Sequence, residues 1–272
     1  MDLYSAELTD RLAKLADASA ETYRNNTPFS HIVIDDFLPA GVLEQVLRDY
    51  PAPEELPWIR FDKPEEKKLA FNEIDTLPAS IRSVLQFMNS ATMLRFLERM
   101  TGISDLIGDP YFIGGGLHQI RRGGHLGVHV DFNKDKRFDF DRRLNMLIYL
   151  NKDWPDSFGG HLELWDAEMK HAVKRVLPLF NRCVVFSTTE TSYHGHPDPL
   201  TCPDSRARRS LATYYYTNGR PEEEQAERHS TVFRARPNAV EPKADALGVA
   251  KRVVLALTPP IVVAALRRLR RP

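Results

Sequence analysis

Cysteine is scarce in this chain of 272 residues, and neither sign of charge is in excess. The two cysteines, Cys183 and Cys202, exclude a disulfide framework and are typical of a reducing compartment. Lys+Arg and Asp+Glu both number 37, so the formal net charge is zero and no global field favours nucleic acid. The composition therefore excludes a disulfide-rich secreted domain and predicts no nucleic-acid partner.

Long apolar runs are missing as well. No stretch is long and apolar enough to span a bilayer, and "MDLYSAELTDRLAKLADASAETY" lacks the apolar segment of a secretory signal. We therefore expect a cytoplasmic protein. Hydrophobic residues still make up 42% of the chain, which is enough for a sizeable core.

Helical periodicity dominates the first part of the chain. Apolar residues recur at helical spacing in residues 5–24, 40–51 and 79–100. The last range could be one or two helices, and residues 31–39 are predicted as a strand. The irregular stretch 54–78 could be a loop or an edge hairpin. We expect residues 1–105 to form a helical support for the next part of the chain.

Residues 106–218 have a different texture, with short apolar or alternating runs separated by Gly, Pro, Asp and Asn. Many short strands joined by such turns predict a sandwich or barrel. The predicted fold class is mainly β with supporting helices (α+β), as one domain over residues 1–218.

Two segments come after the predicted domain. Residues 219–243 are polar and dotted with prolines, which predicts a flexible link. Residues 244–272 are apolar with Lys and Arg on both sides of a Pro-Pro pair, which predicts a basic amphipathic helical tail. Such a tail could lie on an anionic membrane surface or dock on a partner, and the alternative is that it packs on the protein itself or on a second subunit.

The stretch "GGHLGVHVDFNKD" (123–135) raises the question of a metal site. His129 and Asp131 share one face if the segment is extended. A second histidine would complete a 2-His-1-carboxylate facial triad, and "TSYHGHPDP" supplies His194 and His196 after an apolar strand. The ordinary alternative for His129 and Asp131 is a solvated pair in a turn.

An arginine on the next predicted strand strengthens the metal interpretation. In "RARRSLATYYYT", Arg208 shares a face with Ser210, whereas Arg209 points to the other face, and either arginine could be the functional one. A buried guanidinium binds a carboxylate through two parallel hydrogen bonds. An acid that also chelates metal would satisfy both groups, which indicates 2-oxoglutarate.

Four segments in order, 28–46, 119–132, 147–165 and 192–216, resemble the Fe(II)/2-oxoglutarate-dependent dioxygenases in their prolyl 4-hydroxylase-like branch. The resemblance covers about residues 28–218. It implies a double-stranded β-helix (jelly-roll) core over residues 106–218, packed against the N-terminal helices.

The resemblance also assigns roles to residues. It implies that the iron ligands are His129, Asp131 and His194, and that the 2-oxoglutarate-binding residues are Arg208, Ser210 and Tyr149. Tyr149 could instead be a core aromatic. One position departs from the family, because the tyrosine that precedes the GG turn is Ile120 here, which removes a phenol from the co-substrate pocket.

The activity that the resemblance implies is hydroxylation of an unactivated C–H bond, with release of succinate and CO2. The substrate would be a prolyl or other amino-acid residue or a small biosynthetic intermediate, and the cofactors Fe(II), 2-oxoglutarate and O2, with ascorbate as an optional addition. The alternative function is a metal-binding jelly roll without turnover that serves as a sensor or assembly module. Residues 133–143 could form a lid over the site or an ordinary hairpin loop.

Overall fold

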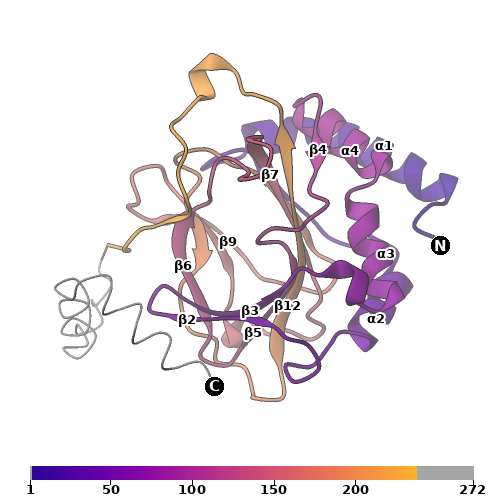
Figure 1. The fold of residues 1–272 in the computed structure, drawn as a ribbon, viewed down its shortest axis with the longest axis vertical. Coiled ribbons are helices and arrows are strands. Elements are labelled where there is room, and N and C mark those ends of the chain that lie inside the picture. Colours follow the sequence, from indigo (N-terminus) through magenta and orange to yellow (C-terminus); the bar gives the residue numbers. More distant parts are fainter. Residues whose placement is uncertain (1, 238–272) are drawn as a thin grey trace, which may run out of the picture. The chain divides into compact units, whose positions relative to one another are not determined.

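The computed structural model describes residues 2–237 of the chain (Figure 1). The predicted tail at 244–272 lies outside these residues, as does the end of the predicted link. Within the described range the chain forms helices first and then a large antiparallel sheet.

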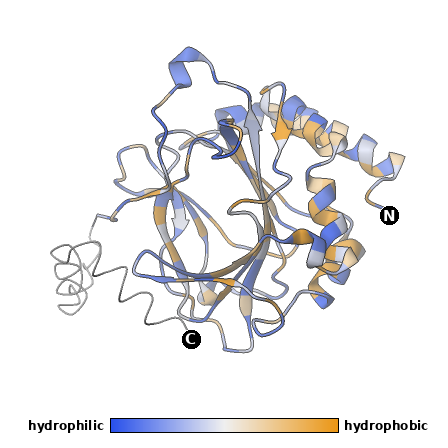
Figure 2. Ribbon diagram, in the orientation of Figure 1, coloured by the Kyte–Doolittle hydropathy of each residue, from blue (hydrophilic) through white to orange (hydrophobic). Residues whose placement is uncertain are grey.

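Four α-helices form where helical spacing was expected: α1 Ala6–Asn25, α2 Ala40–Arg48, α3 Ala79–Met88 and α4 Ala91–Thr101. Ser5 and Ser90 cap α1 and α4, since each hydroxyl accepts a backbone N–H of the first turn. The range 79–100 is two helices because the Ser90 cap interrupts it. The helices lie along one side of the sheet and alternate hydrophobic with hydrophilic positions (Figures 1 and 2).

Thirteen strands form one sheet, in the order β1-β10-β7-β12-β5-β3-β6-β11-β8-β9, with β13, β2 and β4 attached to β6, β3 and β12. The strands are β1 His31–Ile34, β2 Ile59–Lys63, β3 Glu66–Phe71, β4 Ile107–Gly108, β5 Gly116–Arg121, β6 His125–Val130, β7 Asp141–Tyr149, β8 Leu162–Trp165, β9 Ala172–Val176, β10 Cys183–Ser187, β11 His194–His196, β12 Ala207–Thr217 and β13 Val232–Phe233. All the pairings are antiparallel, and the sheet curls into a nearly closed barrel. The predicted jelly-roll fold with helical support is confirmed.

The irregular stretch 54–78 contains the β2–β3 hairpin, one of its two predicted forms, but β3 is not an edge strand. It pairs with β5 through Leu69–Phe71 and with β6 through Glu66 and Lys67. One short strand therefore joins the two halves of the barrel. Its charged residues and the nearby prolines hid this central position in the sequence.

Strands β7 and β12 present two chemically different faces. Leu144, Met146 and Ile148 of β7 pack with Leu211 and Tyr215 of β12 in the main hydrophobic core, which the four helices share. The opposite face of β12 points into the barrel and carries Arg208, Ser210 and Tyr214. This alternation places the core outside the barrel wall and leaves the interior for polar groups.

Residues 219–237 differ from the flexible link that was predicted, and the compact unit runs through Pro237. Val232 and Phe233 pair with Val130 and His129, so β13 occupies an edge of β6 that β3 leaves open. The loop before it, with the short helix Glu222–Glu224, is hydrophilic (Figure 2). Its polar composition indicated a link, whereas the β13 pairing and hydrogen bonds such as that from the Asn133 amide to the Glu227 carbonyl oxygen hold it on the barrel.

Residues 133–143 comprise most of the anchored hairpin loop between β6 and β7 and the first residues of β7. Asp135 accepts hydrogen bonds from the backbone N–H groups of Arg137 and Phe138, and Lys134 forms a β-bridge with Asp141.

None of the helices in residues 2–237 has the length and apolar character needed to cross a membrane.

A glycine at the start of β5 tests the close approach of β3 and β5. Gly116 has φ +80°, and a Cβ there would clash with the carbonyl oxygen of Phe71. We expect Gly116→Ala to lower the free energy of unfolding by at least about 2 kcal/mol in urea denaturation. The matched control is Gly41→Ala in α2, where no atom lies within 4 Å; helix propensity should raise stability there by about 0.5–1 kcal/mol. Equal effects at the two glycines would contradict the assigned strand packing.

Candidate functional site

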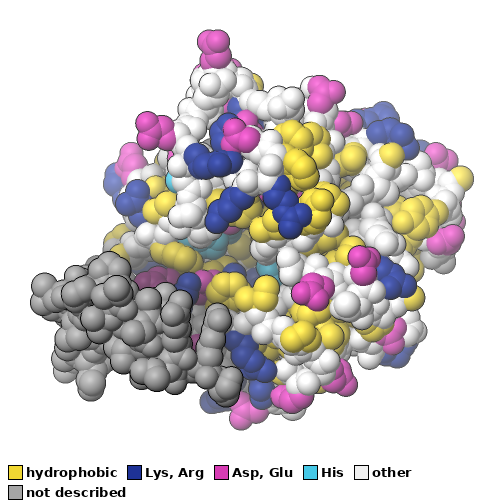
Figure 3. Space-filling view, viewed as in Figure 1, with side chains coloured by type: hydrophobic (Ala, Val, Ile, Leu, Met, Phe, Trp, Pro, Cys, Tyr) yellow, Lys and Arg dark blue, Asp and Glu magenta, His cyan; other side chains and the backbone are white. Residues whose placement is uncertain are grey.

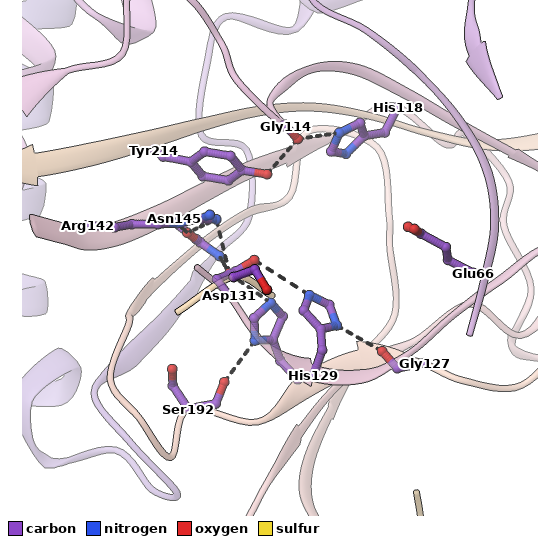
Figure 4. A network of polar contacts seen from close by, with 12 residues as sticks. Glu66, Gly114, His118, Gly127, His129, Asp131, Arg142, Asn145, Ser192 and Tyr214 are labelled. Atoms are coloured by element: carbon purple, nitrogen blue, oxygen red, sulfur yellow. Dashed lines mark hydrogen bonds and ion pairs between the residues drawn. The ribbon is translucent and has the colours of Figure 1, made fainter. Parts of the chain in front are cut away.

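Three side chains from two neighbouring strands meet inside the barrel (Figure 4). His129 lies near the end of β6, Asp131 follows that strand, and His194 begins β11, directly opposite His129. Their candidate ligand atoms all lie within 4.8 Å of one another. The residues predicted as metal ligands are thus brought together.

The two histidines are oriented by the backbone. The Nδ1 atom of His129 lies 2.8 Å from the carbonyl oxygen of Gly127, and that of His194 lies 2.9 Å from the carbonyl oxygen of Ser192. Because a carbonyl only accepts, each Nδ1 carries a proton, and in the neutral ring this tautomer leaves the lone pair on Nε2. Burial, and then the neighbouring His194, lower the pKa of His129, which keeps its ring neutral.

Asp131 faces these lone pairs with its carboxylate. Its Oδ1 lies 3.6 Å from Nε2 of His129, and its Oδ2 lies 3.3 Å from Nε2 of His194. Three electron-pair donors that converge without a shared proton need a cation between them. Two imidazoles and one carboxylate suit a divalent first-row metal and leave three positions open. The residues present therefore fit a metal such as Fe(II).

Asp131 is also held from behind. Arg142 Nη2 lies 3.0 Å from Oδ2, and the amide of Asn145 donates to the same oxygen at 2.7 Å. Burial alone would raise the pKa of Asp131, but the positive charge around it, that of Arg142 first, outweighs burial and keeps the pKa well below its usual range. The carboxylate is therefore ionised and fixed in orientation, as a metal ligand requires.

A β-bulge aims Arg142 at this carboxylate. Tyr215 pairs with Leu144 but Tyr216 pairs with Arg142, so Arg143 is an extra residue in β7. Without the bulge, Arg142 and Asn145 would face opposite sides, because they are three residues apart. The guanidinium then lies over the Tyr214 ring, with its carbon 3.4 Å from the centroid.

Arg208 is the second buried cation of the interior, 4% exposed. Its Nε donates to the carbonyl oxygen of Gly160 at 2.8 Å, and its Nη2 donates to the Tyr149 hydroxyl at 3.1 Å. No carboxylate of the described residues pairs with it, and burial lowers its pKa. A buried guanidinium in this state can bind an anion from the cavity.

The neighbours of Arg208 distinguish the predicted alternatives. Arg209 points away from the interior and donates to Gln119, whereas Ser210 lines the same cavity as Arg208. Tyr149 contacts the guanidinium but is not among the residues that line the cavity. Its position suits a residue that orients Arg208, and burial raises the pKa of its hydroxyl.

Metal-ligand candidates and Arg208 border one cavity of about 230 Å³. It is also lined by Phe61, Glu66, Lys68, Gly114, His118, Ile120, Leu126, Phe132, Arg142, Asn145, Leu147, Leu162, Phe186, Gly195, His196, Ser210, Tyr214, Thr231 and Phe233. Figure 3 shows a hollow on this face in which histidine atoms are visible beside charged side chains.

Several of these residues were missed in the sequence. Asn145 could have been found, since it shares the inward face of β7 with Leu147 and Tyr149. Arg142 could not have been found in this way, because the bulge changes the face of β7 to which its side chain points. Phe233 lies in the segment predicted as a link, and its ring centroid is 5.3 Å from that of His129.

The comparisons with known proteins agree with this geometry. The model of the 2OG-Fe(II) oxygenase superfamily matches residues 115–247, which contain the three candidate ligands and Arg208. Over these residues the chain is similar to this superfamily. A curated relative, the mouse (Mus musculus) prolyl 3-hydroxylase OGFOD1, is 29% identical over 79 residues, which span 28% of this chain but 14% of the relative.

Solved structures share the fold of this oxygenase. A Pseudomonas putida prolyl-4-hydroxylase has a TM-score of 0.55 and 18% identity, with 76% of this chain and 100% of that chain covered. A Trichoplax adhaerens prolyl hydroxylase, solved with a hypoxia inducible factor peptide fragment, has a TM-score of 0.54 and 17% identity, with 79% and 96% covered. The predicted recognition of a prolyl hydroxylase-like 2-oxoglutarate oxygenase is confirmed.

The pairing of Asp131 with Arg142 gives a testable stability effect. We expect Asp131→Ala to abolish divalent-metal binding in calorimetry and to lower the free energy of unfolding of the metal-free protein by roughly 3–5 kcal/mol, because Arg142 stays buried without a counter-charge.

The double variant Asp131→Ala/Arg142→Met separates the two effects. It should recover much of the lost stability, since no lone charge remains, but none of the metal binding. If the second substitution lowers stability further, Arg142 is not the partner that Asp131 neutralises.

Proposed function

We propose that this protein is an Fe(II)- and 2-oxoglutarate-dependent dioxygenase that hydroxylates an unactivated C–H bond. When bound, the metal and co-substrate supply the oxidising chemistry, with O2 as oxidant and succinate and CO2 as products of the co-substrate. The curated relative aligns over a small part of its own length, so the activity is proposed from the site.

One observation carries the proposal. The ligand atoms of His129, Asp131 and His194 converge in the same cavity as Arg208, a buried cation without an acidic partner among the described residues. A metal site alone would not need the arginine. A ligand that chelates metal at one end and carries a carboxylate at the other satisfies both.

Each group of the chain has a defined task in this proposal. His129, Asp131 and His194 would hold Fe(II), and Arg142 and Asn145 would keep the carboxylate oriented. Arg208 would bind the distal carboxylate of 2-oxoglutarate, with Ser210 beside it and Tyr149 holding the guanidinium. Phe186 and Phe233 pack against the histidine rings and keep water from the metal side.

The proposed substrate is a prolyl or other amino-acid residue or a small biosynthetic intermediate. The solved relatives named above support a prolyl residue, and the hollow beside the histidines gives access from the surface (Figure 3). From the sequence alone we further propose a cytoplasmic location, an optional role for ascorbate, and contact of residues 244–272 with a membrane surface or partner.

Succinate release tests the proposed activity. Purified protein with Fe(II), 2-oxoglutarate and O2 should form succinate slowly even without its substrate, and Asp131→Ala should form none. Arg208→Ala should raise the KM for 2-oxoglutarate at least roughly 100-fold, because it removes a bidentate, charge-assisted contact.

The neighbouring arginine provides the control. Arg209→Ala should change the KM for 2-oxoglutarate by no more than a few-fold, because Arg209 points to Gln119 outside the cavity. A wild type that neither forms succinate nor binds 2-oxoglutarate in calorimetry would contradict the oxygenase. Metal binding alone would then favour the sensor or assembly module.

A further inference from the structure

His196 is a buried histidine whose ring has no hydrogen-bond partner. It is 3% exposed and lines the cavity, yet neither Nδ1 nor Nε2 has a partner among the described residues. The other cavity histidines, His118, His129 and His194, each place a ring nitrogen on a backbone carbonyl. A buried polar group left without a partner costs stability, so an exception of this kind calls for an explanation.

The position of His196 points away from the metal. It lies two residues beyond His194 on β11 and on the same face, which is a displacement of about 6.6 Å along the strand. A bulge in β6 pairs it with Leu126, three residues before His129, so both pairs face the cavity. His196 therefore lies farther along the cavity wall from Asp131 and His129 than His194 does.

Arg208 lines the same cavity as His196. Neither ring nitrogen of His196 is used within the described residues, so the ring has an N–H to donate in either tautomer. Arg208 itself uses Nε and Nη2 on Gly160 and Tyr149 and has no acidic partner among residues 2–237. A cation and an N–H donor that line the same cavity are together suited to a carboxylate.

The wall next to Arg208 is apolar on its β5 side. Ile120 lines the cavity and pairs with Arg208 across β5 and β12, so an apolar side chain occupies this point. Ile120 cannot form a hydrogen bond at this point of the wall, whereas the imidazole of His196 on β11 can.

We propose that His196 is a second donor to the distal carboxylate of 2-oxoglutarate and acts together with Arg208. This inference rests on the proposed function. The metal-chelating end of the ligand would lie at His194 and its far carboxylate at His196 and Arg208, which matches the order of His194 and His196 along β11. The unpaired ring is then a cost of the free protein that binding of the co-substrate removes.

Co-substrate affinity is the first measurement. Calorimetry with the full chain loaded with Mn(II) should show a Kd for 2-oxoglutarate that is roughly 10- to 100-fold higher in His196→Leu, because one hydrogen bond to a charged group is lost. His196→Gln retains an N–H donor and should return the Kd to within a few-fold of the wild type. The affinity for Mn(II) alone should be unchanged in both variants.

Thermal stability is the second measurement. Without metal or co-substrate, His196→Leu should raise the Tm by roughly 2–4 °C, because it removes an unpaired polar group from an apolar surrounding. His31→Leu is the matched control: His31 is a buried strand histidine outside the cavity whose Nδ1 bonds the carbonyl of Phe29. It should lower the Tm and leave the Kd for 2-oxoglutarate unchanged.

The outcomes separate this inference from the proposed function. Unchanged co-substrate affinity in His196→Leu overturns the role of His196 and leaves the oxygenase intact. Equal loss of affinity in the Leu and Gln variants, with a lowered Tm in both, also overturns it, since His196 is then a packing residue. A wild type that binds Mn(II) but not 2-oxoglutarate overturns the proposed function itself, and with it this ligand for His196.

Discussion

A buried carboxylate that faces two imidazoles is the constraint on which the rest of the site depends. Asp131 is ionised inside the barrel, and the lone pairs of His129 and His194 point toward it. Such a group is stable only between positive charges. Arg142 on β7 supplies one positive charge. The three converging ligand atoms are placed so that a metal ion between them would supply the second.

This polar interior explains why the main hydrophobic core lies elsewhere. A barrel filled with charged and hydrogen-bonding groups buries little apolar surface inside, so the same strands use their outer faces for stability. Leu144, Met146 and Ile148 pack against the helices while Asn145 and Leu147 face the cavity. The N-terminal helices thereby stabilise a site to which they contribute no cavity-lining residue.

The candidate metal ligands and the pair Arg208–His196 form two chemically different parts of one cavity. The first is fully supported from within the chain, because Gly127, Ser192, Asn145 and Arg142 orient its donors. In the part of the cavity near Arg208, the guanidinium has no acidic partner among the described residues, and the ring nitrogens of His196 have no hydrogen-bond partner there. This asymmetry is the physical basis for assigning a ligand with two unlike ends.

The sequence by itself determined the parts of the site that obey strand periodicity. His129 and Asp131 are two residues apart, as are Arg208 and Ser210, and period-two spacing predicted that each pair shares a face. The resemblance to a known family implied their common cavity and the jelly-roll fold. The tertiary structure alone decided what depends on register or long-range pairing. A bulge turned Arg142 inward, β3 bridged two halves of the barrel, and β13 brought Phe233 onto His129. A one-residue shift reverses the face of every later side chain in the strand, and such a shift depends on the partner strand, which no local pattern contains.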